Sequence, residues 1–216
     1  MWQYGVLVVP IVLGLLALRT DRLVFKVGVP GTCGLILLVG VPEIIGPNWP
    51  VIFVVAALVF SMIGDVFLSN KGANEHFFVF GIGAYLFAHI GYGAFALFYG
   101  KMDWLALGVL LLGYLVYYLV KLRPAVDEPL LSAAVLCYLI VSCATLAAAI
   151  GMQQPAATRW LYAVGITLIV LSDTFISFNE FLAYRTFNGL ILPTYYLAHI
   201  SITLAILVRV GPGGGT

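Results

Sequence analysis

The sequence predicts an all-α membrane protein in which eight transmembrane helices form one bundle. Hydrophobic residues make up 63% of the chain and charged residues only 9%, whereas about 25% of the residues in soluble domains are charged. Mean hydropathy is correspondingly high, at +1.11. The apolar residues gather in stretches of about 20 residues, the length that crosses a bilayer, and the connections between them are short.

The first apolar stretch begins almost at the N-terminus. It has no basic segment before it and no small-residue cleavage site after it, so we expect a transmembrane helix and not a signal peptide. The eight expected spans cover residues 3–19, 23–41, 50–69, 77–99, 103–121, 130–150, 158–179 and 190–209. We expect residues 1–210 to form a single transmembrane domain, with residues 211–216 as a flexible, glycine-rich tail.

Basic residues between the spans predict the orientation. Most of them fall in the odd-numbered connections: Arg19, Arg22, Lys26, Lys71, Lys121, Arg123 and Arg185. Only Lys101, Arg159 and Arg209 fall on the other side. The positive-inside rule then places the odd connections in the cytoplasm and both termini outside. Short connections and the lack of a targeting segment favour a bacterial inner membrane.

Two aspartates lie inside apolar spans in the same short frame. Asp65 is in GDVFLSN and Asp173 is in SDTFISFN, and each is followed by Phe and Ser two and four residues later. An ionisable residue at membrane depth costs roughly 2.5–3.5 kcal/mol on insertion scales, so it indicates a functional site. Both lie about fifteen residues into spans that start outside, which places both in the cytoplasmic half of the membrane.

The helices that follow these two spans also resemble each other. The fourth carries Tyr85 and His89 in AYLFAHI, and the eighth carries Tyr195, Tyr196 and His199 in YYLAHI. We therefore expect spans three and four to repeat as spans seven and eight, related by rotation about the membrane normal. Coincidence within a sequence of few residue types is the alternative.

Residues that share a helical face with the aspartates can complete one polar cavity. Ser69 shares a face with Asp65, whereas Ser177 and Glu180 share one with Asp173. The candidate substrate-binding residues are Lys26, Ser69, Tyr85, His89, Ser177, Asn179, Tyr195, Tyr196 and His199. The alternative is structural: polar side chains that fix helix packing by hydrogen bonds, and a Lys26 that only reaches toward the interface.

Other function classes lack support in the sequence. Net charge is only +1, so no nucleic-acid partner is expected. The motifs Gly-x-Ser-x-Gly and His-Glu-x-x-His and a phosphate-binding glycine loop are missing. The cysteines Cys33, Cys137 and Cys143 have no metal-ligand spacing, so they are expected only to pack. We expect neither a cofactor nor a resident metal.

Four longer segments carry the polar residues in order: SMIGDVFLSN, FVFGIGAYLFAHIGY, LIVLSDTFISFNEF and LPTYYLAHI. Together with Lys26 and the following Pro30, they resemble the YhhN-like lysoplasmalogenase family over most of the chain. The resemblance implies an integral membrane hydrolase whose partner is a lysophospholipid in the bilayer. Relatives cleave the vinyl ether bond of lysoplasmalogens, giving a fatty aldehyde and glycerophosphocholine or glycerophosphoethanolamine. It also implies Asp65 and Asp173 as the acidic catalytic pair.

Acid–base chemistry fits two carboxyl groups. Vinyl ether hydrolysis begins with proton delivery to the β-carbon, which forms an oxocarbenium ion that water attacks. One aspartate would donate the proton, and the other would stabilise the cation and activate water. A close, buried pair can share one proton between its members. The sequence does not decide which aspartate is the acid.

Three other functions stay open at this point. A proton-coupled transporter of small solutes or lipids would also use buried acids and parallel repeats. A zinc-dependent intramembrane lipid hydrolase would use His89, His199 and the aspartates as metal ligands. A lipid-binding scaffold would bind without cleaving.

Overall fold

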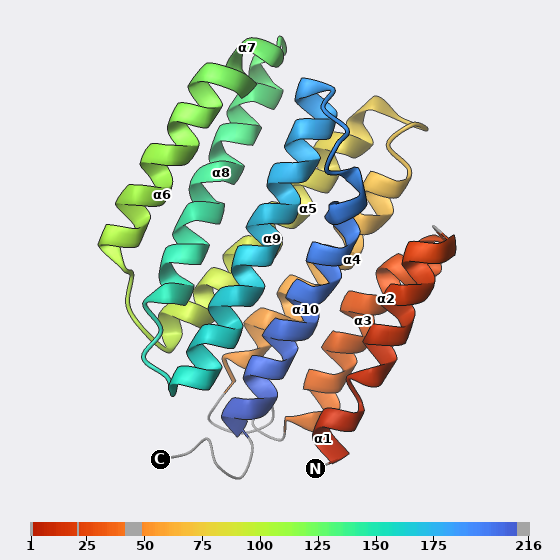
Figure 1. Ribbon diagram of the computed structural model, residues 1–216, viewed down its shortest axis with the longest axis vertical. Coiled ribbons are helices and arrows are strands. Elements are labelled where there is room, and N and C mark those ends of the chain that lie inside the picture. The colour runs from red at the N-terminus through yellow and green to blue at the C-terminus, as the bar shows by residue number, and fades with distance from the viewer. Residues whose placement is uncertain (1, 21, 42–48, 211–216) are drawn as a thin grey trace.

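The computed structural model describes residues 2–20, 22–41 and 49–210, so the expected tail lies outside the described residues. Helix makes up 85% of the structure, and no strand occurs in the described residues, which confirms the all-α class. The helices run up and down side by side (Figure 1). They are α1 (Trp2–Gly5), α2 (Val8–Thr20), α3 (Leu23–Gly40), α4 (Val51–Ser69), α5 (Glu75–Phe98), α6 (Trp104–Tyr117), the π-helix η2 (Tyr118–Leu122), α7 (Arg123–Ala125), α8 (Pro129–Ile150), α9 (Ala156–Leu182) and α10 (Asn188–Val210).

Seven stretches of helix are long and apolar enough to cross a membrane, with α6, η2 and α7 counted together as Trp104–Ala125. The first expected span differs, because it is divided into α1 and the 13-residue α2. Pro10 explains the division: it has no N–H to donate to the carbonyl of Val6, one turn earlier. At 1.5 Å per residue α2 extends about 20 Å, less than the roughly 30 Å hydrocarbon core. Its length alone does not establish an eighth span.

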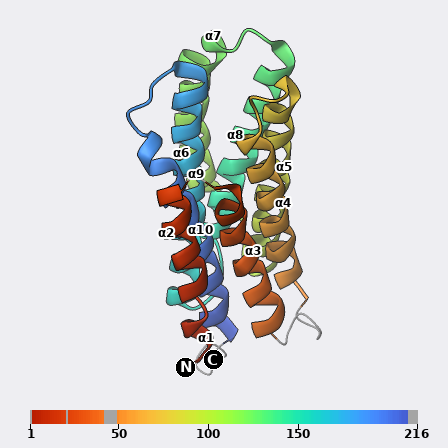
Figure 2. The same ribbon diagram turned by 90° about the vertical axis from the view of Figure 1, so that its right-hand side faces the viewer.

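The core lies between two pairs of helices. Figure 2, viewed from the side of α2 and α3, shows α9 and α10 on one side and α4 and α5 on the other. Side chains from both pairs meet in one buried apolar cluster, which includes Leu58, Phe95, Ile166 and Ile202. These four helices therefore form the buried centre of the bundle.

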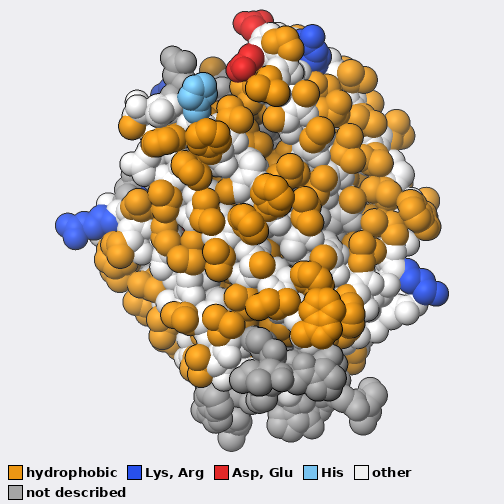
Figure 3. All heavy atoms as spheres, turned by 180° about the vertical axis from the view of Figure 1, so that it is seen from behind, with side chains coloured by type: hydrophobic (Ala, Val, Ile, Leu, Met, Phe, Trp, Pro, Cys, Tyr) orange, Lys and Arg blue, Asp and Glu red, His pale blue; other side chains and the backbone are white. Residues whose placement is uncertain are grey.

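The outer surface is apolar over most of its area. Figure 3 shows hydrophobic side chains covering the rear face, with charged side chains near its edges and one end. Large apolar side chains point outward, among them Val39 and Leu105, which are 80% and 79% exposed. Monomeric soluble proteins rarely carry such large contiguous apolar patches. The surface therefore fits burial in a lipid bilayer.

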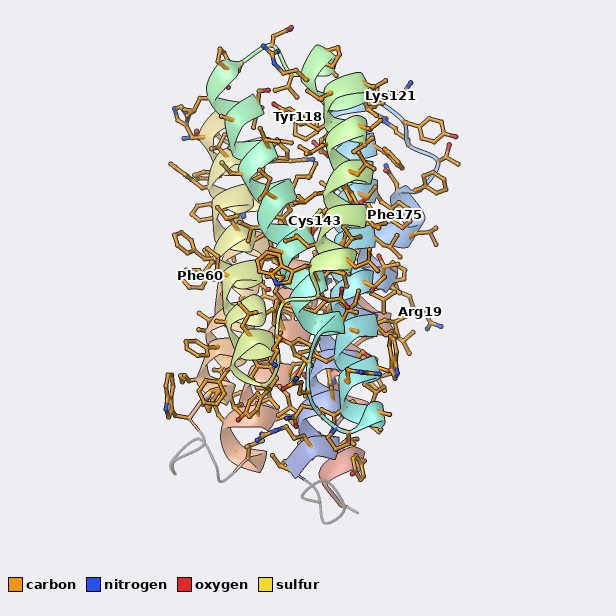
Figure 4. The ribbon with its side chains drawn as sticks, turned by 90° about the vertical axis from the view of Figure 1, so that its left-hand side faces the viewer. Arg19, Phe60, Tyr118, Lys121, Cys143 and Phe175 are labelled. Carbon is orange, nitrogen blue, oxygen red and sulfur yellow. The ribbon has the colours of Figure 1, made fainter. Side chains whose placement is uncertain are left out.

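Helix α6 is the least embedded of the long helices. No residue of α6 is buried, and its main packing partner is α8. Figure 4 shows α6 and α8 side by side, and Tyr118 and Cys143 belong to a small apolar cluster between them. This loose attachment leaves room beside the neighbouring helix α9.

The helices of the pair α4–α5 run in the same directions as those of the pair α9–α10. In Figure 1, α4 and α9 both run toward the end of the bundle that carries α7, and α5 and α10 both return. Shared direction is necessary for the expected parallel repeat. Superposition about the membrane normal is not established by it, so the repeat stays a prediction.

Candidate functional site

A polar cavity of about 470 Å³ lies at the end of the bundle away from α1. The beginnings of α3 and α10 and the ends of α4 and α9 surround it. It brings together seven of the eleven predicted site residues: Lys26, Asp65, Ser69, Tyr85, Asp173, Asn179 and Tyr195. Both aspartates of the matched frames therefore line one space.

Asp65 is the buried member of the pair, at 7% exposure. Tyr85 of α5 donates a hydrogen bond from its Oη to Asp65 Oδ1 at 2.6 Å. Gly64 permits this approach, because a Cβ at that position would lie 2.8 Å from the Tyr85 ring. Lys26 and Tyr195 lie near enough to interact with the same carboxyl group. Asp65 Oδ2 is buried and has no hydrogen-bond partner among the described residues.

Asp173 is half-buried and has more partners. Its Oδ2 accepts a hydrogen bond from Tyr138 Oη of α8 at 2.7 Å and lies 3.1 Å from His89 Nε2 of α5. The rings of His89 and Tyr138 meet edge to face, with centroids 5.2 Å apart. Three helices thus converge on one carboxylate oxygen, and this convergence fixes its position.

Two smaller cavities, of about 60 and 70 Å³, adjoin the same aspartate. The first lies among α6, η2, α8 and α9 and has Leu122, Leu139 and Val170 in its wall. The second lies among α4, α5, α8 and α9 and has Phe78 and Phe181 in its wall. Both are mainly apolar, and Asp173 lines both of them as well as the polar cavity. Asp173 therefore stands where polar space meets apolar space.

Four predicted residues do not line the polar cavity. Ser177 lines the two apolar cavities and shares a hydrogen bond of 2.7 Å with Tyr117. His89 contacts the site through Asp173. Tyr196 is buried against Gly14 of α2. His199 lies deeper in the bundle, with its Nδ1 3.1 Å from Tyr92 Oη and its ring 4.3 Å from the Tyr195 ring.

A comparison with the sequence models of known families identifies the family of the chain. The sequence model of the YhhN family matches residues 26–206. The chain belongs to the YhhN family. This is the lysoplasmalogenase family. The match starts in α3 and ends in α10, so it covers the seven long helices and both aspartates and leaves out α1 and α2. No curated protein and no solved structure matches the chain.

The sequence did not predict two polar contacts of this YhhN-family site. Tyr138 is a single tyrosine in an otherwise apolar stretch, and nothing in its spacing shows that it points to Asp173. The other contact is the ion pair between Lys71 Nζ and Glu180 Oε1, at 2.5 Å, on the wall of the polar cavity. Its sequence signal is the position of both residues just after the Asp-x-Phe-x-Ser frames.

The zinc alternative lacks a ligand set in the part of the chain that the structure describes. No group of three or more His, Cys, Asp and Glu side chains there is placed to hold a metal ion. His89 contacts Asp173, whereas His199 contacts Tyr92. The two histidines thus belong to different hydrogen-bonded groups.

Proposed function

We propose that this protein is an integral membrane hydrolase that cleaves the vinyl ether bond of a lysoplasmalogen. Its products are a fatty aldehyde and glycerophosphocholine or glycerophosphoethanolamine. The observation that carries the proposal is the position of Asp173 at the junction of a polar cavity and two apolar ones. A lysoplasmalogen is divided in the same way, because its vinyl ether joins a polar glycerophosphate to an aliphatic chain.

Hydrogen bonding divides the roles of the two aspartates. Asp173 accepts a hydrogen bond from Tyr138 and lies beside His89, an arrangement that stabilises a carboxylate. Asp65 has one buried oxygen that receives no hydrogen bond from the described residues. A charged oxygen buried in this way is costly, so Asp65 is the residue suited to hold the proton.

The reaction then follows from these roles. Asp65 donates its proton to the β-carbon of the vinyl ether, and the α-carbon becomes an oxocarbenium ion. Asp173 stabilises this cation and takes a proton from the water that adds to it. The resulting hemiacetal collapses as its hydroxyl proton moves to the glycerol oxygen, which leaves as the alcohol. Proton exchange with water in the polar cavity returns both aspartates to their starting states.

Charge distribution supports an orientation for this site. Lys26 and Lys71 line the polar cavity, and Arg22 and Arg185 lie at the same end of the bundle. The positive-inside rule favours a cytoplasmic position for that end. With α1 and α2 as a short eighth crossing, both termini lie outside a bacterial inner membrane.

Aldehyde release tests the proposal directly. The purified protein in detergent receives a lysoplasmalogen and, separately, a lysophospholipid of equal chain length that has an ester in place of the vinyl ether. We expect aldehyde from the first and no cleavage of the second. Asp173→Asn removes the base, so this variant should lower the rate by about 10²–10⁴, the range for loss of a general acid or base. Wild-type turnover by a folded Asp173→Asn protein would remove this residue from the reaction.

A further inference from the structure

The ion pair on the wall of the polar cavity takes no part in the acid–base steps. Lys71 comes just after α4, and Glu180 lies near the end of α9. Asn179 Nδ2 also donates a hydrogen bond of 2.6 Å to the same Glu180 Oε1. The side chain of Lys71 is 41% exposed and that of Glu180 is 20% exposed, so the pair lies where the cavity meets the surface. A molecule entering the cavity from water meets a cation and an anion together.

Glu180 lies two helical turns beyond Asp173 on α9. Residues seven apart share a face, and their separation along the axis is about 10 Å. In a lysoplasmalogen the ether oxygen and the headgroup nitrogen are joined by a chain of nine single bonds. That chain spans about 10 Å when nearly extended, at roughly 1.2 Å per bond. A substrate with its ether oxygen at Asp173 therefore brings its headgroup nitrogen to the level of Glu180.

We propose that Glu180 and Lys71 recognise a zwitterionic headgroup whose cation is a primary ammonium. The inference rests on the proposed function and concerns the same cavity. The Glu180 carboxylate binds the ammonium, and Lys71 binds the phosphodiester, with Lys26 as a second cation on the cavity wall. A zwitterion replaces the existing ion pair by two pairs of the same kind, so neither charge is left alone. A phosphodiester without a cation would instead lie beside Glu180, which repels it.

The lining favours ethanolamine over choline. A quaternary ammonium has no N–H to donate and is bound in proteins mainly by aromatic cages. Among the lining residues that the structure describes, the aromatic ones are Tyr85 and Tyr195. Tyr85 is bonded to Asp65, and the Tyr195 ring packs against Tyr85. A primary ammonium can donate hydrogen bonds to the Glu180 carboxylate, which a quaternary one cannot.

The test compares headgroups on one alkenyl chain: ethanolamine, choline and glycerol, of which only glycerol carries no cation. For the wild type we expect kcat/KM to be highest for ethanolamine, by about five- to tenfold over glycerol, as for one partly exposed charge-assisted contact. Glu180→Gln should bring the ratio of kcat/KM for ethanolamine over glycerol to about one. The change should appear in KM, with kcat little changed. Glu128→Gln is the matched control, because Glu128 is exposed and lies just before α8. It should keep the wild-type ratio.

A second variant separates the two charges. Lys71→Gln should lower kcat/KM by a similar factor for the substrates with all three headgroups, since each of them carries the phosphate. A Glu180→Gln protein that keeps the wild-type headgroup ratio would overturn the inference, and so would a wild type that prefers the glycerol headgroup.

Failure of the reaction itself can be told apart from failure of this inference. If the wild type releases no aldehyde, calorimetric titration with glycerophosphoethanolamine and glycerophosphoglycerol still tests the headgroup site. Tighter binding of the ethanolamine compound by the wild type, lost in Glu180→Gln, supports the inference without the reaction. Equal binding of both compounds by the wild type overturns it.

Discussion

Asp65 and Asp173 occupy the same frame in the sequence and different surroundings in the fold. Asp65 is buried and accepts a hydrogen bond from Tyr85. Asp173 is half-buried, and its Oδ2 contacts both Tyr138 and His89. The partners come from neighbouring helices and not from the frame itself. A short frame that occurs twice in the sequence can therefore place the same side chain in two different surroundings.

The other members of the frame show which part of the likeness is structural. Phe67 and Phe175 each pack against an aromatic ring that comes later in the chain, with centroids 5.5 Å from Phe77 and 5.2 Å from Phe187. The serines differ, because Ser69 lines the polar cavity, whereas Ser177 lines the apolar ones. The frame preserves aromatic packing, and the adjacent helices determine the polar contacts.

Removal of either carboxyl group should have the largest effect on activity. Asp65→Asn, like Asp173→Asn, should lower aldehyde release by about 10²–10⁴, since an amide can neither donate the proton nor carry the charge. Their stabilities should differ. Asp173→Asn loses charge-assisted contacts worth about 1.5–3 kcal/mol, whereas Asp65→Asn replaces a protonated group by one of similar shape. Melting temperatures measured beside turnover test the comparison, and a lower melting temperature for Asp65→Asn than for Asp173→Asn would contradict it.

The tyrosine donors give the next largest effect. Tyr85→Phe removes the hydroxyl that bonds to Asp65. This hydrogen bond becomes charge-assisted as Asp65 gives up its proton, so its loss should lower kcat about 10- to 100-fold. Tyr138→Phe leaves His89 beside Asp173 and should lower kcat less than tenfold. Steady-state kinetics on both variants measure the difference. A greater loss in Tyr138→Phe would mean that the two carboxyl groups have exchanged roles.

The two histidines should separate activity from stability. His89→Gln weakens the support of Asp173 and should lower kcat several-fold. His199 contacts Tyr92 deep in the bundle, so His199→Gln should leave kcat within about twofold and destabilise the fold by about 1–3 kcal/mol. Thermal unfolding and turnover measured in the same detergent distinguish these outcomes. Strong loss of kcat in a stable His199→Gln protein would extend the site beyond the polar cavity.

The smallest expected effect is that of a chelator. If the aspartates act directly on the substrate, EDTA should leave aldehyde release unchanged. If activity disappeared with EDTA and returned with added zinc, the aspartates would act through a metal ion and not directly on the substrate.

Hydropathy and length were sufficient to predict most of the fold. The expected span 50–69 corresponds to α4 (Val51–Ser69), and 130–150 corresponds to α8 (Pro129–Ile150). A bilayer demands long apolar helices whatever their neighbours are, so this signal is local. Apolar composition predicts a continuous first span, but it carries no information on the backbone, where Pro10 separates α1 from α2.

Position along a helix and depth in the membrane predict much of the polar cavity, since Asp65 and Asp173 lie on different helices and both line it. Asp65 and Ser69 lie one turn apart, and both line the polar cavity as expected. The contact of Tyr138 with Asp173 depends on the rotation of α8 about its axis, which tertiary packing determines. Ser177 shares a face with Asp173, but Tyr117 of α6 lies against it, so it borders apolar space.

The loose attachment of α6 bears on how a turnover would end. Among the described residues, two side-chain hydrogen bonds join it to α9, Tyr114 to Thr174 at 2.9 Å and Tyr117 to Ser177 at 2.7 Å. The cavity behind them borders α6, the outermost helix of the bundle. A cleaved lysoplasmalogen yields one water-soluble and one oil-soluble product. If the proposed reaction takes place here, the polar cavity at the surface would release the water-soluble product, and the apolar cavity beside α6 would release the oil-soluble one. The aldehyde would then partition directly into the bilayer without crossing water.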